Sequence, residues 1–97
     1  SDLREIKVVQ FSLLYSFEVA VRWSSFSAAA TELTLTLSAV SHRISQLDNE
    51  LNIRLFSLSH RKVELTLEGE RIFAAMNTSL NFLNHEVQSI KNQGLAG

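Results

Sequence analysis

Hydroxyl, imidazole and guanidinium side chains are concentrated in one stretch of this chain, residues 36 to 46. Ser38, Ser41 and His42 are small or planar polar groups, and the next residue, Arg43, adds a fixed positive charge. Such groups form hydrogen bonds with base edges and phosphate oxygens, which is the chemistry of DNA recognition. If the stretch is helical, its polar side chains point away from its apolar ones. The sequence therefore predicts a polar helix face that fits a major groove.

Small and apolar residues around this stretch have the spacing of two short helices that cross at a steep angle. Ala30 stands where a close helix crossing tolerates little more than a methyl group. Leu33 would close the first helix, and Leu35 would anchor the turn. The second helix has a buried stripe at steps of four, three and four residues, formed by Val40, Ile44, Leu47 and Leu51. The spacing predicts a helix-turn-helix, with two ordinary core helices of a small bundle as the alternative.

The helices of this motif are expected over residues 27–33 and 36–49. Ser27 and Thr36 would start them, because a hydroxyl can accept a hydrogen bond from the free amide donors of a first turn. The turn carries Thr34 where a glycine is usual, so it must close with ordinary dihedral angles or with strain. An earlier helix is expected from about residue 10 to Trp23.

A short two-stranded hairpin is expected after the helix pair. His60 and Arg61 lie at its turn, and from Lys62 to residue 65 the side chains alternate outward and inward as in a strand. A basic hairpin directly after a recognition helix is the wing of a winged helix-turn-helix, which lies along phosphates or enters the minor groove. A solvated turn of a small sheet is the alternative.

A long final helix is expected from residue 67 or 68 to about Asn92, with Thr66 as its cap. Apolar residues recur along it at heptad spacing: Met76, Leu80, Leu83, Val87 and Ile90. A helix of about 25 residues is roughly 37 Å long, more than the rest of so small a domain could cover. We therefore expect this stripe to meet a second copy of the chain, since two-fold pairing is the commonest oligomer. Packing of the helix start on its own domain, with a frayed end, is the alternative.

Positive charge is concentrated in the segment expected to touch DNA. The chain as a whole has a net charge of −1, which by itself disfavours a nucleic-acid partner. Residues 36–63, however, hold four basic and two acidic groups, whereas residues 1–35 carry a net charge of −1 and residues 64–97 a net charge of −2. The local excess supports the motif.

The composition argues against several other classes of function. The chain has no cysteine, and its three histidines lack the carboxylate support of a metal site. It has no phosphate-binding loop and no clustered carboxylates near a histidine, so we expect neither an enzyme nor a cofactor. No apolar run reaches membrane-spanning length and no signal peptide is visible, so we expect a cytoplasmic protein without a membrane partner.

Several motifs occur in a characteristic order, with x for any residue: Phe17-x-x-Ala20, Ser25-Phe26-Ser27-x-Ala29-Ala30-x-x-Leu33, Ser38-Ala39-Val40-Ser41, Ile44-x-x-Leu47, Glu50-Leu51, Leu55-Phe56 and Arg61-x-Val63-x-Leu65-Thr66-x-x-Gly69. Over residues 14 to 90 the chain resembles the N-terminal domain of LysR-type transcriptional regulators. The resemblance implies a mainly α fold. After an N-terminal extension (1–9), a winged helix-turn-helix with a short two-stranded wing would span residues 10–66. A linker helix that mediates dimerisation would span 67–93, and the effector-binding domain of the family would lie outside this fragment.

The resemblance also implies which residues contact DNA. Positions that face bases and phosphates at the start of the recognition helix are matched by Ser38, Ser41, His42 and Arg43. Ser27 and Thr36 match helix starts near the DNA backbone. Arg61 and Lys62 match the wing, to which a protonated His60 would add charge.

Two residues depart from the pattern of the family. Leu37 stands where a glutamine is common, and it could still contact a thymine methyl group. Leu58 replaces an arginine that usually follows the Leu-Phe pair, and it cannot neutralise a phosphate. We therefore expect a smaller salt dependence of DNA binding than in relatives that keep the arginine.

Within the family, the chain resembles the subgroup that activates the D-serine deaminase operon. The resemblance lies in three stretches: Ser41-His42-Arg43-Ile44, residues 59–66 and Ile90-Lys91-Asn92-Gln93. This implies D-serine as the effector of the missing domain. The sequence as a whole predicts the sequence-specific DNA-binding domain of a bacterial regulator, which binds double-stranded promoter DNA as a homodimer, with a tetramer as a further state of the full-length protein. The alternative function is a protein-interaction module, in which the final helix is the functional surface and the helix pair is only core.

Overall fold

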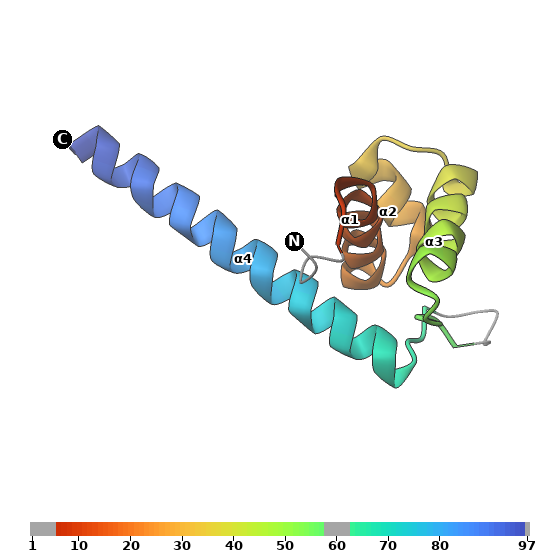
Figure 1. Cartoon of the computed structure of the whole chain (residues 1–97). Coiled ribbons are helices and arrows are strands. Elements are labelled where there is room, and N and C mark those ends of the chain that lie inside the picture. The colour runs from red at the N-terminus through yellow and green to blue at the C-terminus, as the bar shows by residue number, and fades with distance from the viewer. Residues whose placement is uncertain (1–5, 58–62, 97) are drawn as a thin grey trace.

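The structure, a computed structural model, describes residues 6–57 and 63–96. Over these ranges it is helical, with α1 (Val8–Trp23), α2 (Phe26–Leu33), α3 (Leu37–Leu51) and α4 (Leu67–Ala96). Helices α1, α2 and α3 pack together, and α4 extends away from them (Figure 1). The molecule is elongated as a result, with extents of 52 × 36 × 22 Å.

Helix α1 begins two residues earlier than predicted. The backbone N–H of Lys7 donates to Oε1 of Gln10 at 2.9 Å, so the Gln10 side chain closes the first turn. Val8 and Val9 therefore belong to the helix, so the predicted N-terminal extension, residues 1–9, loses its last two residues to α1. The helix ends at Trp23 as predicted, where Ser24 takes a left-handed conformation with φ 51°.

Helix α2 is capped by Ser25, so the prediction that Ser27 starts it is wrong. Ser25 has an extended backbone, and its Oγ accepts a hydrogen bond from the N–H of Ala28 at 3.0 Å. This cap places Phe26 at the first helical position, where its ring packs edge-on against Phe56 at a centroid distance of 5.6 Å. Ser27 is exposed within the first turn.

Helix α3 begins as predicted, because Thr36 Oγ1 accepts a hydrogen bond from the N–H of Ala39 at 3.0 Å. It continues two residues beyond the predicted end, until Asn52 closes it in a left-handed conformation. The turn before it is strained, since Thr34 has φ 54° although its side chain is β-branched.

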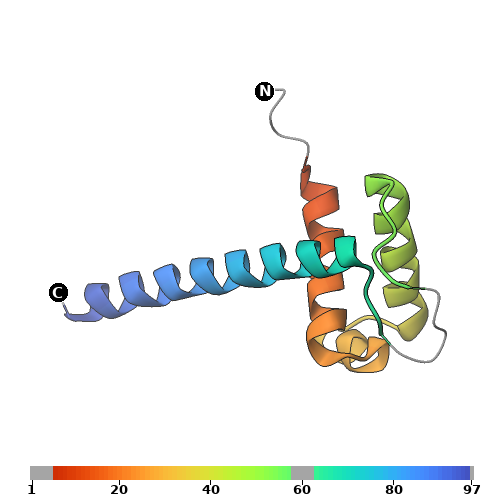
Figure 2. The same ribbon diagram turned by 90° about the horizontal axis from the view of Figure 1, so that it is seen from below.

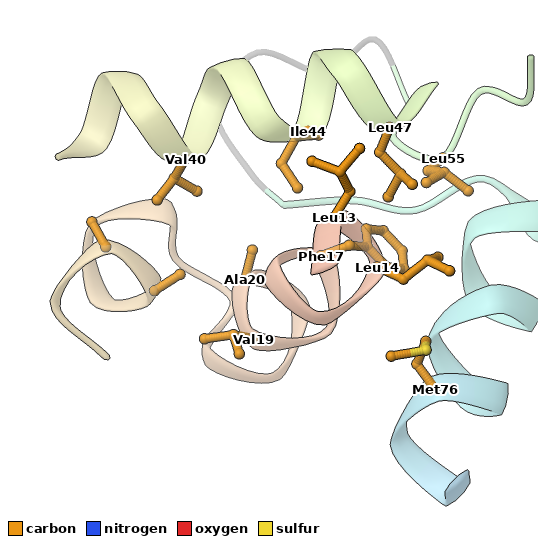
Figure 3. Packing of buried hydrophobic residues seen from close by; sticks show 12 residues of the cluster. Leu13, Leu14, Phe17, Val19, Ala20, Val40, Ile44, Leu47, Leu55 and Met76 are labelled. Atoms are coloured by element: carbon orange, nitrogen blue, oxygen red, sulfur yellow. The ribbon is translucent and has the colours of Figure 1, made fainter. Parts of the chain in front are cut away.

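The core lies between α1 and α3. Ile44 and Leu47 point from α3 toward Leu13 and Phe17 of α1, whereas Val40 lies over α2 (Figure 3). Ala30 is buried at the crossing of α2, as its spacing predicts, whereas Leu51 at the end of the predicted stripe is only partly buried. The apolar stripe of the predicted helix-turn-helix is thus its packing surface.

The predicted two-stranded wing is not confirmed. The described residues contain no strand; a single antiparallel bridge joins Phe56 to Leu65, and the N–H of Ser57 donates to the carbonyl oxygen of Glu64 at 2.9 Å. The predicted tip lies outside the described residues, together with Leu58, His60, Arg61 and Lys62.

Helix α4 begins at the base of this bridge. Thr66 caps it as predicted, with Oγ1 accepting from the N–H of Gly69 at 3.0 Å. Thr66 also donates through its own N–H to the carbonyl oxygen of Leu55 at 3.0 Å. The helix crosses α1 and continues beyond it (Figure 2), to Ala96 rather than to the predicted Asn92. No helix in the described part of the chain combines the length and the hydropathy needed to cross a membrane.

Candidate nucleic-acid interface

The N-terminal half of α3 presents a polar surface away from the core. Ser38, Ser41 and His42 are exposed, and Leu37 is 51% exposed at the tip. The buried residues of α3 occupy the opposite side of the same helix. With the cap Thr36, the structure therefore brings together five of the predicted DNA contacts on one accessible helix end.

Arg43 lies at the flank of this surface, beside α1. Its side chain is half-buried, and Nη1 is 3.3 Å from Ser12 Oγ, to which it donates a hydrogen bond. It lines a shallow pocket with Phe11, Tyr15 and Leu35. Arg43 is thus held between α1 and α3. Its guanidinium has five N–H donors, so a contact with DNA would not require loss of the Ser12 bond.

A buried carboxylate that sequence reasoning missed joins α1 to α4. Glu18 is only 3% exposed, and its Oε2 accepts from Arg22 Nε at 3.1 Å and from Asn77 Nδ2 at 3.0 Å. The four-residue step from Glu18 to Arg22 signals a helical ion pair in the sequence. The contact with Asn77, 59 residues away, carries no such local signal.

The same arginine ties α1 to α2. Arg22 Nη2 donates to Glu32 Oε2 at 2.8 Å, and Trp23 Nε1 donates to Glu32 Oε1 at 2.6 Å. The hydrogen bonds from Arg22 and then from Trp23 lower the pKa of Glu32, and the bond to Glu32 is the main reason that the pKa of Arg22 is raised. These contacts fix the first helix of the motif against α1.

A second carboxylate lies where α3 turns toward the predicted wing. Burial raises the pKa of Asp48, an effect partly offset by the backbone N–H of Leu55 and by the charge of Arg54. Its Oδ1 is buried without a hydrogen-bond partner among the described residues. The backbone carbonyl of Asp48 accepts from Ile53 at 3.3 Å, so this residue holds the segment after α3.

The predicted dimerisation stripe of α4 divides into two parts. Met76 is buried in the core of the domain, and Leu80 is half-buried against it. Farther along, Leu83, Val87 and Ile90 are 59%, 39% and 64% exposed, and Phe82 beside them is 68% exposed. Met76 thus serves the domain itself, and the exposed apolar surface lies on the later part of the helix, which the domain does not cover (Figure 1).

No group of three or more histidine, aspartate or glutamate side chains in the described segments could hold a metal ion. What the site offers is an accessible polar helix end, backed by a short helix that crosses it at Ala30. This geometry defines a helix-turn-helix domain.

Residues 11–70 match the bacterial regulatory helix-turn-helix proteins of the lysR family, and the chain belongs to that family. It is 58% identical over 88 residues to the HTH-type transcriptional regulator DsdC of Escherichia coli K12, covering 91% of this chain and 28% of that protein. It is 44% identical over 72 residues to the regulator PerR of the same organism, covering 74% of this chain and 24% of that protein. The chain therefore spans about a quarter of the length of these curated relatives.

Solved structures of the same family have the same fold. The BenM DNA-binding domain in complex with benA site 1 DNA has a TM-score of 0.74 and 28% identity, and the match covers 86% of this chain and 93% of that one. The full-length virulence activator AphB of Vibrio cholerae, described as a member of the LTTR family, has a TM-score of 0.71 and 26% identity over 82% of this chain and 28% of that one. The chain is thus a LysR-family helix-turn-helix domain of the kind found in transcriptional regulators.

Proposed function

We propose that this domain binds promoter DNA sequence-specifically as a homodimer, with the polar face of α3 in the major groove. The observation that carries the proposal is the exposure of Ser38, Ser41 and His42 on the helix end that Thr36 caps. Short side chains allow this end to approach base edges closely. The complex of the BenM domain with DNA supports the same role here.

The proposed contacts extend to both sides of α3. Ser27 is exposed in the first turn of α2, and its hydroxyl is proposed to contact the DNA backbone. Arg61 and Lys62, with His60, would contact phosphates or the minor groove through a wing. The local excess of positive charge in residues 36–63 favours this orientation.

The dimer is proposed on the apolar surface of α4. Leu83, Val87 and Ile90 are exposed at heptad spacing on a part of the helix that leaves the domain. A second copy of the same helix would cover them, with Leu80 at the edge of the contact. Two recognition helices related by two-fold symmetry would then match the two halves of a pseudo-palindromic site.

In the whole regulator we propose a small-molecule effector bound by another domain, with D-serine as the candidate that the similarity to DsdC favours. A tetramer is a further proposed state of that protein. Promoter DNA places its action in the bacterial cytoplasm. The role proposed for the chain requires no cofactor and no catalytic step.

Fluorescence anisotropy with the promoter duplex adjacent to its own gene tests the proposal. Affinity for this duplex should fall roughly 100-fold between about 50 and 200 mM salt, if about four phosphates are neutralised. A duplex of the same composition in scrambled order is the control and should bind more weakly. Absence of salt-dependent binding to either duplex in dilute buffer would refute DNA binding.

The second candidate function is a protein-interaction module that acts through α4 alone. The exposed Phe82, Leu83 and Ile90 favour it, since such a surface needs a partner in any case. Charge removal by Arg61→Ala with Lys62→Ala distinguishes the two functions. Loss of DNA retention with self-association intact supports DNA binding, whereas unchanged behaviour of this variant supports the interaction module.

A further inference from the structure

Helix α4 is held to the domain at two places before it projects into solvent. Its first turn is fixed by Thr66, whose Oγ1 donates to the carbonyl oxygen of Arg54 at 2.7 Å. Two turns later Met76 enters the core and Asn77 donates to Glu18. Beyond Leu80 the described side chains of α4 are almost all exposed. Among the described residues, the partly buried bond from Asn77 to Glu18 is therefore the last side-chain hydrogen bond between α4 and the rest of the domain.

A small change in the angle of α4 at this point produces a larger displacement at the far end of the helix. From Leu80 to Ala96 the helix runs for about 24 Å at 1.5 Å per residue. A tilt of about 10° at the domain would move its far end by roughly 4 Å over that length. In a dimer built on this part of α4, such a tilt changes the separation of the two recognition helices.

We propose that Glu18 is a positioning residue that fixes the angle of α4 through Asn77 and thereby sets which half-site spacing the dimer prefers. The inference rests on the proposed function, because it assumes a DNA-binding dimer joined through α4. It assigns the choice of spacing to a contact that lies far from the DNA-facing end of α3.

The chemistry of this contact suits a positioning role. Apolar packing by Met76 and Leu80 has little directional preference, whereas a hydrogen bond to a carboxylate is directional and strong. Glu18 is itself oriented by Arg22, which is held in turn by Glu32 on α2. A continuous series of hydrogen bonds therefore connects α2, the first helix of the motif, to α4. Because the Glu18 carboxylate is buried, loss of any of its hydrogen bonds would cost free energy of folding.

A reversal of the donor and the acceptor tests the contact. Asn77→Asp places a second carboxylate against Glu18 and removes the donor, while the acceptor for Asn81, now 3.2 Å away, is kept. Adding Glu18→Gln removes one of the two facing charges and supplies an NH2 group that can donate to the new aspartate. Because Oε2 of Glu18 accepts from both Arg22 and Asn77, the glutamine must turn its amide to keep its oxygen toward Arg22. Asn77→Ala removes the donor without adding charge and serves if the aspartate variant does not fold. Asn84→Ala, at an exposed position farther along the same helix, is the matched control.

The first readout is the affinity of each variant for duplexes whose half-site spacing changes by one base pair at a time. For the native chain and for Asn84→Ala we expect one preferred spacing. For Asn77→Asp and Asn77→Ala we expect the ratio of affinities between the preferred and the next spacing to fall about tenfold. The double variant should recover the native ratio. A loss of stability that leaves this ratio unchanged, or a double variant that fails to recover it, would overturn the proposal.

The second readout does not involve DNA. The chain has no cysteine, so Thr31→Cys on α2 and Glu86→Cys on α4, both exposed positions, accept a pair of spin labels. Dilution of labelled chain into unlabelled chain restricts the measurement to the two labels of one chain. The distribution of distances between these two labels should broaden in Asn77→Asp and narrow again in the double variant. This result without any DNA binding would refute the proposed function and leave the positioning role of Glu18 standing. An unchanged distribution would refute the positioning role itself.

Discussion

Thr34 forms the turn between α2 and α3 in a conformation that suits glycine better than a β-branched residue. Its φ is 54°, and its Oγ1 donates only to the neighbouring carbonyl oxygen of Leu33 in an exposed position. Thr34→Gly should therefore raise the free energy of unfolding by about 1 kcal/mol, because the relief of strain outweighs the entropy of glycine in the unfolded chain. Urea unfolding followed by circular dichroism measures this change.

Thr31→Gly, in the helix that precedes this turn, is the control for the loss of a threonine side chain. It lies inside α2, where glycine should lower the free energy of unfolding by about 0.5 kcal/mol. If Thr34→Gly destabilises the protein as Thr31→Gly does, the turn is not strained.

Asp48 should make stability depend on pH. Burial raises the pKa of this carboxyl in the folded protein, so the folded state holds the proton more tightly than the unfolded state. As the pH rises from about 4 through the raised folded pKa, the charge must be buried and this residue's contribution to stability declines. Asp48→Asn removes this titrating group. The free energy of unfolding of the variant, relative to that of the native chain, should therefore increase from pH 4 to pH 7. Urea unfolding at both values tests this, and a difference that is constant or decreases with pH would contradict it.

At the residue scale, the sequence predicted those side chains that form hydrogen bonds with residues close to them in the chain. Thr36 and Thr66 directly precede α3 and α4, and each caps its helix by accepting from the N–H three residues later, as their types and positions predict. Ser27 was a wrong choice of cap because Ser25, two residues earlier, has the same chemistry and the extended backbone that a cap needs. Asn77 could not be linked to Glu18 from the sequence, since that contact depends on how α4 crosses α1.

At the scale of elements, the junction between α4 and the preceding segment depends on Gly69. A Cβ at this position would lie 2.1 Å from the carbonyl oxygen of Leu55, a backbone atom that also accepts the N–H of Thr66. Gly69→Ala should therefore lower the free energy of unfolding by about 2–3 kcal/mol, through overpacking that a rotamer change cannot relieve. Thermal and urea unfolding measure the loss.

Gly94→Ala is the matched control on the same helix. A Cβ there meets nothing within 4 Å, so alanine should leave the stability unchanged or raise it by at most about 1 kcal/mol. Equal effects at the two glycines would mean that the close approach to Leu55 does not exist.

Periodicity predicted the helices well because each has an apolar face that repeats along it. Val40, Ile44 and Leu47 mark α3 in this way. The ends of helices were less predictable: α1 begins two residues earlier than predicted, where Gln10 closes its first turn, and α3 continues for two residues until Asn52 ends it. The two-stranded wing was predicted from alternation over a few residues, and the described residues have a single bridge there.

At the scale of the whole molecule, the exposed part of α4 should govern self-association. Leu83→Asp introduces a charge into the apolar surface and should convert a dimer to a monomer, with at least a tenfold weaker association. Asn84→Asp makes the same change of charge at an exposed polar position one residue away and should leave association unchanged. Sedimentation equilibrium distinguishes the two. A dimer that withstands Leu83→Asp would place the interface elsewhere.

The overall shape could be predicted only in part. Heptad spacing indicates a helix longer than its domain, and α4 indeed leaves the three-helix unit (Figure 2). The same pattern does not distinguish Met76, which the domain buries, from Ile90, which it leaves exposed. That division depends on the length over which α1 covers α4, which no local pattern encodes.

The central claim is that the polar end of α3 is the surface that meets DNA, and an NMR titration of backbone amides with the promoter duplex tests it most directly. The largest shifts are predicted from Thr36 to Gln46, with the exposed end of α4 near Ile90 little changed. Shifts confined to α4, or a duplex that leaves residues 36–46 unperturbed, would contradict the account.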